Sequence, residues 1–344
     1  MTEWKECLLG DLITFQRGHD LPKSKMSGNG YPVVGSNGII GFHNEYTTEY
    51  PSITVGRSGN VGKPYIVYGR SWSHNTSLYI KEFKGTDPVF IYYFLQTLDL
   101  GNYAGGSAVP TLNRNHIHSL NVRVPADISI QKIIANTLKV LDDKIDKNTA
   151  INKNLEQQAQ VIFLKMFPDI FSASASSSFQ NLIEFSNGRK RPETIGDIPV
   201  YGGNGVLAYT NQSNAENCVI IGRVGAYCGN TFLCPEKCWT SDNAIQAKSK
   251  NEASPLFIYY LLRNASLPSR HIGTGQPLMT QAILNAIPVN EPSTQEIKSF
   301  INICTPLHET IFANEKQNIS LAILRDTLLP KLMSGELDVS DLDI

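Results

Sequence analysis

Two long segments of the chain carry hydrophobic residues at alternating steps of four and three positions, a spacing that keeps one face of a helix against another helix. Each segment follows a proline, Pro125 or Pro292, and sustains the pattern for about five heptads. The face positions of the first segment are Ile134, Leu138, Leu141, Ile145, Asn148, Asn152, Leu155, Ala159, Ile162 and Met166. Those of the second are Phe300, Cys304, Leu307, Ile311, Asn314, Asn318, Leu321, Arg325, Leu328 and Leu332. The pattern predicts two long helices that form a coiled coil.

Two asparagines interrupt the apolar face of each predicted helix at matching places. A buried asparagine lowers stability, but it disfavours every register that leaves its amide facing hydrocarbon. In an antiparallel pair with a pseudo-twofold axis near position 150, Asn148 meets Asn318 and Asn152 meets Asn314. We therefore predict that these four residues set the register. The alternative is that the stretch is exposed or faces another protein.

The rest of the chain favours strands. Residues 1–125 and 179–292 contain short β-branched and aromatic runs that end in glycine-rich turns, for example at 52–55 and 218–221. One shorter helix is expected in each part, at 89–98 and at 256–264, both with a Phe-Ile-Tyr-Tyr run. This run is more typical of a helix packed in a core than of a platform for stacking bases.

The two strand-rich parts repeat each other at a spacing close to 167 residues. Pro32–Gly38 returns as Pro199–Gly205, and Trp72 returns as Trp239. A period of this length indicates a duplicated domain, because solenoid repeats are only ~20–50 residues long. A duplicated binding domain has two similar surfaces, which suit a target with two half-sites, as in pseudo-twofold proteins on DNA.

The predicted fold class is α+β, with two pseudo-twofold-related strand-rich domains and two long helices packed as an antiparallel coiled coil. The predicted boundaries are 1–125 for the first domain, 126–171 for the first helix, 172–178 for a Ser/Ala-rich linker, 179–292 for the second domain, 293–337 for the second helix and 338–344 for an acidic tail.

The formal net charge of −1 over 344 residues argues weakly against a nucleic-acid partner, but the charge is unevenly divided. Residues 1–125 hold 11 basic and 9 acidic side chains, whereas residues 293–344 hold 4 and 8. The globular parts are slightly basic, which permits DNA binding without requiring it. No apolar run approaches the ~18–20 residues that span a bilayer, and the first residues do not resemble a signal peptide, so we expect a cytoplasmic protein with no membrane partner.

Motifs for catalysis are missing from the sequence. Gly202–Gly205 is only a faint match to a nucleotide-binding loop, and no phosphate-binding loop, Gly-x-Ser-x-Gly elbow or Asn-Pro-Pro-Tyr motif of an amino-methyltransferase is present. Asp142-Asp143-Lys144 falls within the first long helix, where we expect a solvated face and no nuclease site. We therefore predict a protein that is not an enzyme.

Four of the six cysteines, Cys218, Cys228, Cys234 and Cys238, lie in the second strand-rich part. Their spacing differs from the Cys-x2-Cys pairs of a zinc ribbon, and the seven histidines show no metal-ligand spacing. We expect reduced, mostly buried thiols and no metal site.

Two Gly-Arg-x-Gly loops are the best candidates for recognition. Arg57 and Arg223 each follow a predicted strand, between glycines that allow close backbone approach to a ligand. Arginine can donate two hydrogen bonds to guanine O6 and N7, or bind a phosphate. An internal salt bridge or a bond to a carbonyl is an equally open alternative. Further candidates for contact with DNA are Ser58, Asn60, Asn75, Ser107, Tyr227, Asn243 and Gln276.

A basic stretch, Arg189-Lys190-Arg191, suits phosphate contacts, which position a protein without distinguishing sequence. Its loose match in the first half comprises Arg17, Lys23 and Lys25.

The chain resembles the specificity (S) subunit of type I restriction–modification systems over its whole length. The most specific match is Leu324–Leu337, which is similar to the end of the family's second helical region. Pro199–Gly205 and the glutamines Gln131 and Gln295, which follow the two prolines, also fit. The chain is compact for the family, and Phe163–Phe167 departs from the corresponding part of the second helix.

The resemblance implies two target recognition domains, each specific for one half of an interrupted double-stranded DNA sequence. The helices would set the spacing and dock two modification subunits, and restriction subunits would join the complex. S-adenosylmethionine and ATP would be bound by those partners, and this chain would bind no cofactor. The alternative is a non-catalytic interaction scaffold or an orphan antirestriction protein with the same fold. A self-sufficient methyltransferase is disfavoured by the missing motifs.

Overall fold

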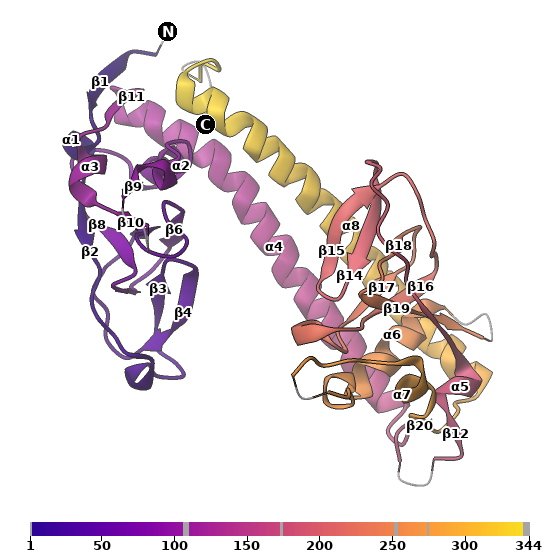
Figure 1. Cartoon of the computed structure of the whole chain (residues 1–344). Helices are drawn as coiled ribbons and strands as arrows, with labels where there is room; N and C mark the ends of the chain where they lie inside the picture. The colour runs from indigo at the N-terminus through magenta and orange to yellow at the C-terminus, as the bar shows by residue number, and fades with distance from the viewer. Residues whose placement is uncertain (1, 106–109, 173–174, 251–253, 274, 340–344) are drawn as a thin grey trace. The chain divides into compact units, whose positions relative to one another are not determined.

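The computed structural model describes residues 2–105, 110–172, 175–250, 254–273 and 275–339 (Figure 1). The chain divides into two compact units, one formed by residues up to 148 together with those from 316 onward, the other by residues 149–315. The division therefore falls within both long helices and not at the domain boundaries that the sequence suggested. The reason is that each long helix packs against a different domain at each of its ends.

The first strand-rich domain contains two main sheets. The four-stranded sheet has the order β2 (Ile13–Arg17), β8 (Ser77–Phe83), β5 (Ser52–Gly56) and β6 (Pro64–Val67). The three-stranded sheet has the order β4 (Gly38–His43), β3 (Tyr31–Gly35) and β7 (Trp72–Ser73). Two small ladders pair β1 (Trp4–Leu8) with β11 (Asn121–Pro125) and β9 (Ala104–Gly105) with β10 (Thr111–Leu112). The helices are α1 (Leu9–Leu12), α2 (Pro88–Gln96) and α3 (Arg114–His118), with 3-10 turns η1 (Lys23–Lys25) and η2 (Leu100–Tyr103).

The second domain repeats this order. Its four-stranded sheet is β13 (Ile183–Asn187), β19 (Ala244–Ser249), β16 (Cys218–Gly222) and β17 (Thr231–Cys234), and its three-stranded sheet is β15 (Gly205–Thr210), β14 (Ile198–Gly202) and β18 (Trp239–Thr240). A small ladder pairs β12 (Ser177–Ser178) with β20 (Pro288–Val289). The helices are α5 (Phe179–Leu182), α6 (Pro255–Asn264) and α7 (Gln281–Asn285), with 3-10 turns η3 (Gly225–Tyr227) and η4 (Leu267–Ser269). The duplication inferred from the sequence is therefore a duplication of topology.

The repeated segments Pro32–Gly38 and Pro199–Gly205 each end in an Asn-Gly pair, which forms the tight turn from β3 to β4 and from β14 to β15. Gly38 and Gly205 adopt φ angles of 84° and 91°, in the left-handed region that glycine enters without steric cost. In each domain the strand before this turn also pairs in parallel with the short strand that begins at the matched tryptophan, Trp72 or Trp239. The turn and the tryptophan therefore belong to one small sheet in both domains.

The two long helices are α4 (Ile128–Met166) and α8 (Thr294–Ser334), of 39 and 41 residues. Every face position expected from the four-and-three spacing is buried or half-buried. A capping box starts α8: the Ser293 N–H donates to the Glu296 carboxylate at 2.8 Å, and the Glu296 N–H donates to the Ser293 hydroxyl at 3.3 Å. The hydrogen bonds from Ser293 lower the pKa of Glu296.

The structure contains both asparagine pairs that the antiparallel register requires. In the first unit, Asn148 Nδ2 donates to Asn318 Oδ1 at 2.9 Å and to Gln317 Oε1 at 2.8 Å. In the second unit, Asn314 Nδ2 donates to Asn152 Oδ1 at 2.8 Å. Because Asn148 is fully buried, its amide needs these partners to avoid the cost of an unsatisfied polar group.

The Phe-Ile-Tyr-Tyr runs lie in the core, as predicted. In the first unit, Phe90 and Tyr93 of α2 belong to a buried cluster with Leu138 of α4 and Leu332 of α8. The corresponding cluster of the second unit has four aromatic rings at its centre: Phe163 of α4, Phe257 and Tyr260 of α6 and Phe300 of α8. Each domain thus shares its core with segments of both long helices.

Two expectations from the sequence were wrong in detail. Asp142 does not lie on a solvated face, because it accepts hydrogen bonds from the Tyr93 hydroxyl at 2.6 Å and from Arg325 at 2.7 Å. The predicted linker 172–178 includes residues 173–174, outside the described residues, and it ends in strand β12, because Ser177 and Ser178 pair with β20. Within the described part of the chain, no helix is both long and apolar enough to cross a lipid bilayer.

The Asn152–Asn314 pair allows a direct test of the register. We expect Asn152→Leu to destabilise the chain by ~1–3 kcal/mol, because the Asn314 amide loses its acceptor inside the helix pair. Asn152→Leu/Asn314→Leu removes both polar groups and should recover most of that loss. Urea unfolding midpoints measure the difference, with Lys153→Ala on the exposed side of α4 as the control. A double variant as unstable as the single variant would show that the amide pair is not what the single change disrupts.

Candidate nucleic-acid interface

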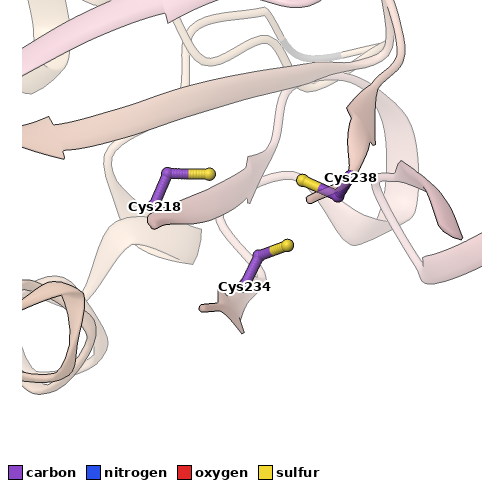
Figure 2. A group of neighbouring side chains, drawn as sticks. All are labelled: Cys218, Cys234 and Cys238. Carbon is purple, nitrogen blue, oxygen red and sulfur yellow. The ribbon is translucent and has the colours of Figure 1, made fainter. Parts of the chain in front are cut away.

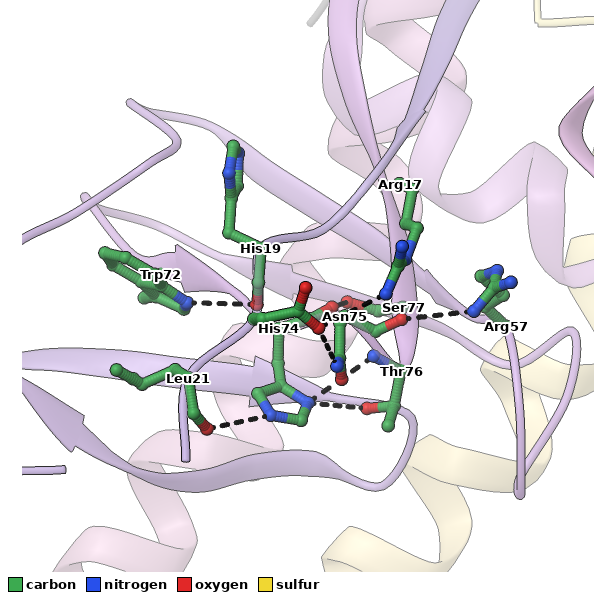
Figure 3. A network of polar contacts seen from close by, with 10 residues as sticks. Arg17, His19, Leu21, Arg57, Trp72, His74, Asn75, Thr76 and Ser77 are labelled. Atoms are coloured by element: carbon green, nitrogen blue, oxygen red, sulfur yellow. Dashed lines mark hydrogen bonds and ion pairs between the residues drawn. The ribbon is translucent and has the colours of Figure 1, made fainter. Parts of the chain in front are cut away.

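The first glycine-flanked arginine, Arg57, directly follows strand β5. Its backbone is fixed on both sides, since its N–H donates to the Thr76 carbonyl at 2.8 Å and its carbonyl accepts from the Leu112 N–H at 2.9 Å. The half-buried side chain donates to the Asn75 carbonyl oxygen at 3.5 Å (Figure 3). A hydrogen bond of this length is weak. The backbone of this loop is therefore held firmly, while the guanidinium group is held only loosely.

Arg223 occupies the same position in the second domain, after strand β16. Its N–H donates to the Asn243 carbonyl at 2.9 Å, and its carbonyl accepts from the Met279 N–H at 2.8 Å. Its guanidinium group donates to the Asp242 carbonyl at 3.4 Å, and its Nε atom is buried without a partner among the described residues. The two arginines are thus anchored in the same way by their backbones and by one long bond from the side chain.

These contacts show which residues correspond in the turns after the matched tryptophans. The candidates Asn75 and Asn243 lie three and four residues after Trp72 and Trp239. The residue that accepts from the guanidinium group is Asn75 in the first domain and Asp242 in the second. Thr76 therefore matches Asn243, and the repeat places a neutral amide and a carboxylate at equivalent positions.

A polar network holds the turn that accepts from Arg57 (Figure 3). The Asn75 side chain donates to Asp20, which also accepts from Arg17 at 3.2 Å. His74 joins the Thr76 hydroxyl at 3.0 Å to the Leu21 carbonyl at 3.2 Å. Asp20 and His74 were missed by the sequence analysis, because neither lies in a repeated motif.

The hydrogen bonds of the matched tryptophans show which residue of the first domain corresponds to the start of the basic stretch in the second. Trp72 Nε1 donates to the His19 carbonyl at 3.4 Å, and Trp239 Nε1 donates to the Arg189 carbonyl at 3.2 Å. Arg189 therefore takes the place of His19, and the expected match to Arg17 was wrong. Arg189 pairs with Ser241, next to the turn that accepts from Arg223, and Arg189, Lys190 and Arg191 are all exposed.

Four of the remaining candidates lie in or beside the two arginine loops. Asn60 Nδ2 donates to the Tyr65 hydroxyl at 3.3 Å, and Ser58 pairs with Thr111. Tyr227 is 48% exposed, so its ring is available to a ligand. Gln276 is also exposed, and its neighbour Pro277 accepts from the Gly225 N–H at 2.9 Å.

The other three candidates separate from this group. Lys23 and Lys25 are exposed on η1, whose end lies beside β4 because Ser27 pairs with Phe42. Ser107 lies outside the described residues. Within each domain, the structure thus places the arginine loop next to the turn after the tryptophan, and in the second domain the basic stretch lies beside that turn.

Comparison with known proteins identifies the family. The model for the type I restriction modification DNA specificity domain matches residues 1–157 and 181–322. The specificity subunit of the type I restriction enzyme MjaIX from Methanocaldococcus jannaschii is 25% identical over 303 residues, covering 74% of this chain and 70% of that protein. The specificity subunit of the Escherichia coli enzyme EcoprrI is 25% identical over 157 residues, covering 44% of this chain and 39% of that protein.

Among solved structures, the S subunit of a type I restriction–modification system from M. genitalium is similar, with a TM-score of 0.65 at 19% identity. The match covers 98% of this chain and 97% of that one, and it shows that the two share a fold. The family model covers most of the sequence, and both curated relatives are specificity subunits. The chain therefore belongs to the type I restriction–modification DNA specificity family, as a DNA-recognition subunit and not as a catalytic one.

Proposed function

We propose that each domain recognises one half of an interrupted double-stranded DNA sequence, with Arg57 central to one half and Arg223 to the other. The observation that carries this proposal is the repeated anchoring of the two arginines. Both backbones are fixed by two hydrogen bonds, and toward the described residues each guanidinium group makes a single long bond to a carbonyl. A side chain held this loosely can turn to a base edge or a phosphate with little loss of internal bonding.

The neighbours of the two arginines differ, which suits two different half-sequences. Beside Arg57, the Asn75 side chain is bonded to Asp20. Beside Arg223 stand the exposed Asp242 and the basic stretch that starts at Arg189. Direct contacts to base edges depend on these donors and acceptors, whereas phosphate contacts from the basic stretch position the domain.

The long helices supply the rest of the proposed role, which is to set the spacing of the half-sites and to dock two modification subunits. Both helices carry large apolar side chains on their exposed sides, among them Val140 at 64%, Val161 at 55% and Ile323 at 62% exposed. These side chains are available for contact with a partner subunit. In this proposal restriction subunits join the complex in the cytoplasm, and S-adenosylmethionine and ATP are bound by the partner subunits.

Exchange of one domain tests the division of labour. We expect that replacing residues 1–125 with the matching domain of another family member changes one half of the methylated sequence and leaves the other half unchanged. Sequencing that detects methylated adenines genome-wide, in cells that supply the modification subunit, gives both halves at once. If both halves changed together, the domains would recognise DNA jointly. If no methylation depended on the chain, the scaffold alternative would hold.

The arginines distinguish base recognition from phosphate contact. If Arg57 contacts a base edge, Arg57→Ala should cost ~1–3 kcal/mol of binding and relax specificity at one position of the cognate site. If it contacts only phosphate, affinity should fall equally for all sequences, with a weaker dependence on salt. Binding by the complex with the modification subunit, across single-base variants at two salt concentrations, separates these outcomes.

Two further variants complete this experiment. Arg223→Ala should act on the other half-site only. Arg123→Ala is the matched control, because Arg123 lies on β11 and packs over the Trp4 ring, away from the arginine loops. A lowered melting temperature with unchanged specificity would assign Arg57 a structural role instead. Unchanged affinity with normal stability would remove it from the interface.

A further inference from the structure

Three cysteines of the second domain come together in its interior (Figure 2). Cys218 begins β16, Cys234 ends β17 and Cys238 directly precedes β18. Their Sγ atoms all lie within 4.8 Å of one another. All three are free thiols, and their side chains are 0%, 3% and 0% exposed. The cluster forms because Cys218 and Cys234 are cross-strand partners, while Cys238 follows Cys234 after a turn of three residues.

The first domain shows what the fold needs at these places. Its cross-strand pair equivalent to Cys218 and Cys234 is Ser52 and Val67. The bridge between Ala215 and Cys238 corresponds to that between Thr48 and Ser71. Ser52 and Ser71 share a hydrogen bond of 2.5 Å between their hydroxyls. The same backbone is thus built in one domain with two serines and a valine, and in the other with three thiols, so the fold itself does not require sulfur.

A fourth polar group lies beside the thiols. In the first domain, the Ser73 hydroxyl bonds to Thr48 at 2.6 Å. In the second domain, Thr240 occupies the place of Ser73 in the small sheet, and Ala215 occupies the place of Thr48. Alanine has no hydroxyl to pair with Thr240. The Thr240 hydroxyl is fully buried, lies next to the Cys238 thiol and has no oxygen or nitrogen partner among the described residues. A buried hydroxyl without such a partner costs stability, and a bond to a sulfur or to a ligand would remove that cost.

We propose that Cys218, Cys234 and Cys238 bind one Zn²⁺ ion, which joins strands β16 and β17 to the segment before β18. At Zn–S bonds of about 2.3 Å with tetrahedral angles, the sulfur atoms would lie about 3.8 Å apart. The sulfurs are already within 4.8 Å of one another, at most about 1 Å more than this distance. Cys-x3-Cys spacing, as between Cys234 and Cys238, falls within the range found in zinc sites.

The surroundings favour a divalent, thiophilic ion. The cluster is embedded among Ile220, Ala244 and the rings of Tyr201 and Phe232. Three thiolates in such an apolar environment are costly unless a cation compensates them, and a 2+ ion leaves less residual charge than a 1+ ion. Each Zn–S bond replaces an S–H bond, whose proton is released to solvent. A neutral oxygen completes the four ligands, and the Thr240 hydroxyl beside Cys238 can supply it or hydrogen-bond to it.

The site would act on the part of the domain that carries the recognition loop. Strand β16 runs from Cys218 to Gly222 and is followed directly by Arg223. A metal at the start of β16 anchors that strand to β17 and β18, and so stabilises the second domain without touching DNA. This role is independent of the proposed function, because it concerns stability and metal content alone.

Metal content of the full-length chain tests the proposal. The purified chain is reconstituted with Zn²⁺, dialysed, and analysed for metal and for its melting temperature with and without a strong chelator. We expect one zinc per chain and a lower melting temperature after chelation. Substitution by Co²⁺ should give a near-ultraviolet thiolate charge-transfer band and visible bands of a tetrahedral site. The ¹¹³Cd NMR shift of the cadmium-loaded wild-type chain should report three sulfur ligands, and this measurement needs no variant.

The duplication offers a variant that is expected to fold. Cys218→Ser/Cys234→Val/Cys238→Ser gives the second domain the residues of the first, and it should lose the zinc, the cobalt bands and the response to chelator. Cys228→Ser is the matched control, since Cys228 is another buried thiol of the same domain outside the cluster, and it should keep all three.

Three outcomes would overturn the proposal. Zinc retained equally by the triple variant would be adventitious surface binding. A wild-type chain that retains no zinc would show plain buried thiols. A mass lower by two hydrogens, with two fewer reactive thiols after denaturation, would show a disulfide instead.

Discussion

Neither strand-rich domain closes its hydrophobic core without the long helices, and the rest of the structure depends on this shared packing. In the first unit, Leu138 of α4 and Leu332 of α8 are fully buried in the same cluster as Phe90. In the second, Phe163 and Phe300 take the equivalent role. Because close-packed interiors resist rearrangement, a domain cannot turn on its own helix segments without opening its core. Within each unit the recognition loops are therefore held in a fixed orientation to the helices.

Polar groups within the helix pair specify the register that the apolar face leaves open. The asparagine pairs fix the register near the middle of the two helices, and Asp142 of α4 fixes it nearer the first domain. Asp142 accepts from Arg325 of α8 across the helix pair in the first unit, whereas Glu156 accepts from Tyr259 of α6 at 2.6 Å and holds α4 against the second domain. Burial lowers the pKa of His308 to about 4, so the imidazole is neutral and can accept from the Tyr260 hydroxyl at 2.8 Å. A shifted register of α4 and α8 would separate the asparagine pairs and the Asp142–Arg325 pair, at a cost of about 1–3 kcal/mol for each buried group left unpaired.

The fold was predictable where the signal is local or periodic. The four-and-three spacing gave the helix faces, the repeat gave two similar domains, and the Phe-Ile-Tyr-Tyr runs were correctly placed in the core. The errors concern contacts that depend on spatial neighbours. Asp142 looked solvated because its partner Arg325 is distant in sequence. Arg189 was matched to Arg17 because the spacing of the repeat shifts there, and only the tryptophan bond identifies His19 as its counterpart. The thiol cluster escaped notice because it depends on the register of β16 and β17.

The duplication has kept the backbone at the recognition loops and changed the side chains around it. Gly56 and Gly222 are required in both domains, because a Cβ atom at either would collide with a backbone carbonyl of the same loop. The neighbours of the arginines are not conserved between the halves. His19 is followed by Asp20, whereas Arg189 is followed by Lys190, so an acidic neighbour in the first domain becomes a basic one in the second. Asp20 is itself bonded to Arg17 and Asn75, and its charge is compensated by the Arg17 guanidinium group. Because Arg189, Lys190 and Arg191 outnumber Asp242, the second loop keeps an excess of positive charge, which in the proposed function suits contact with a phosphate.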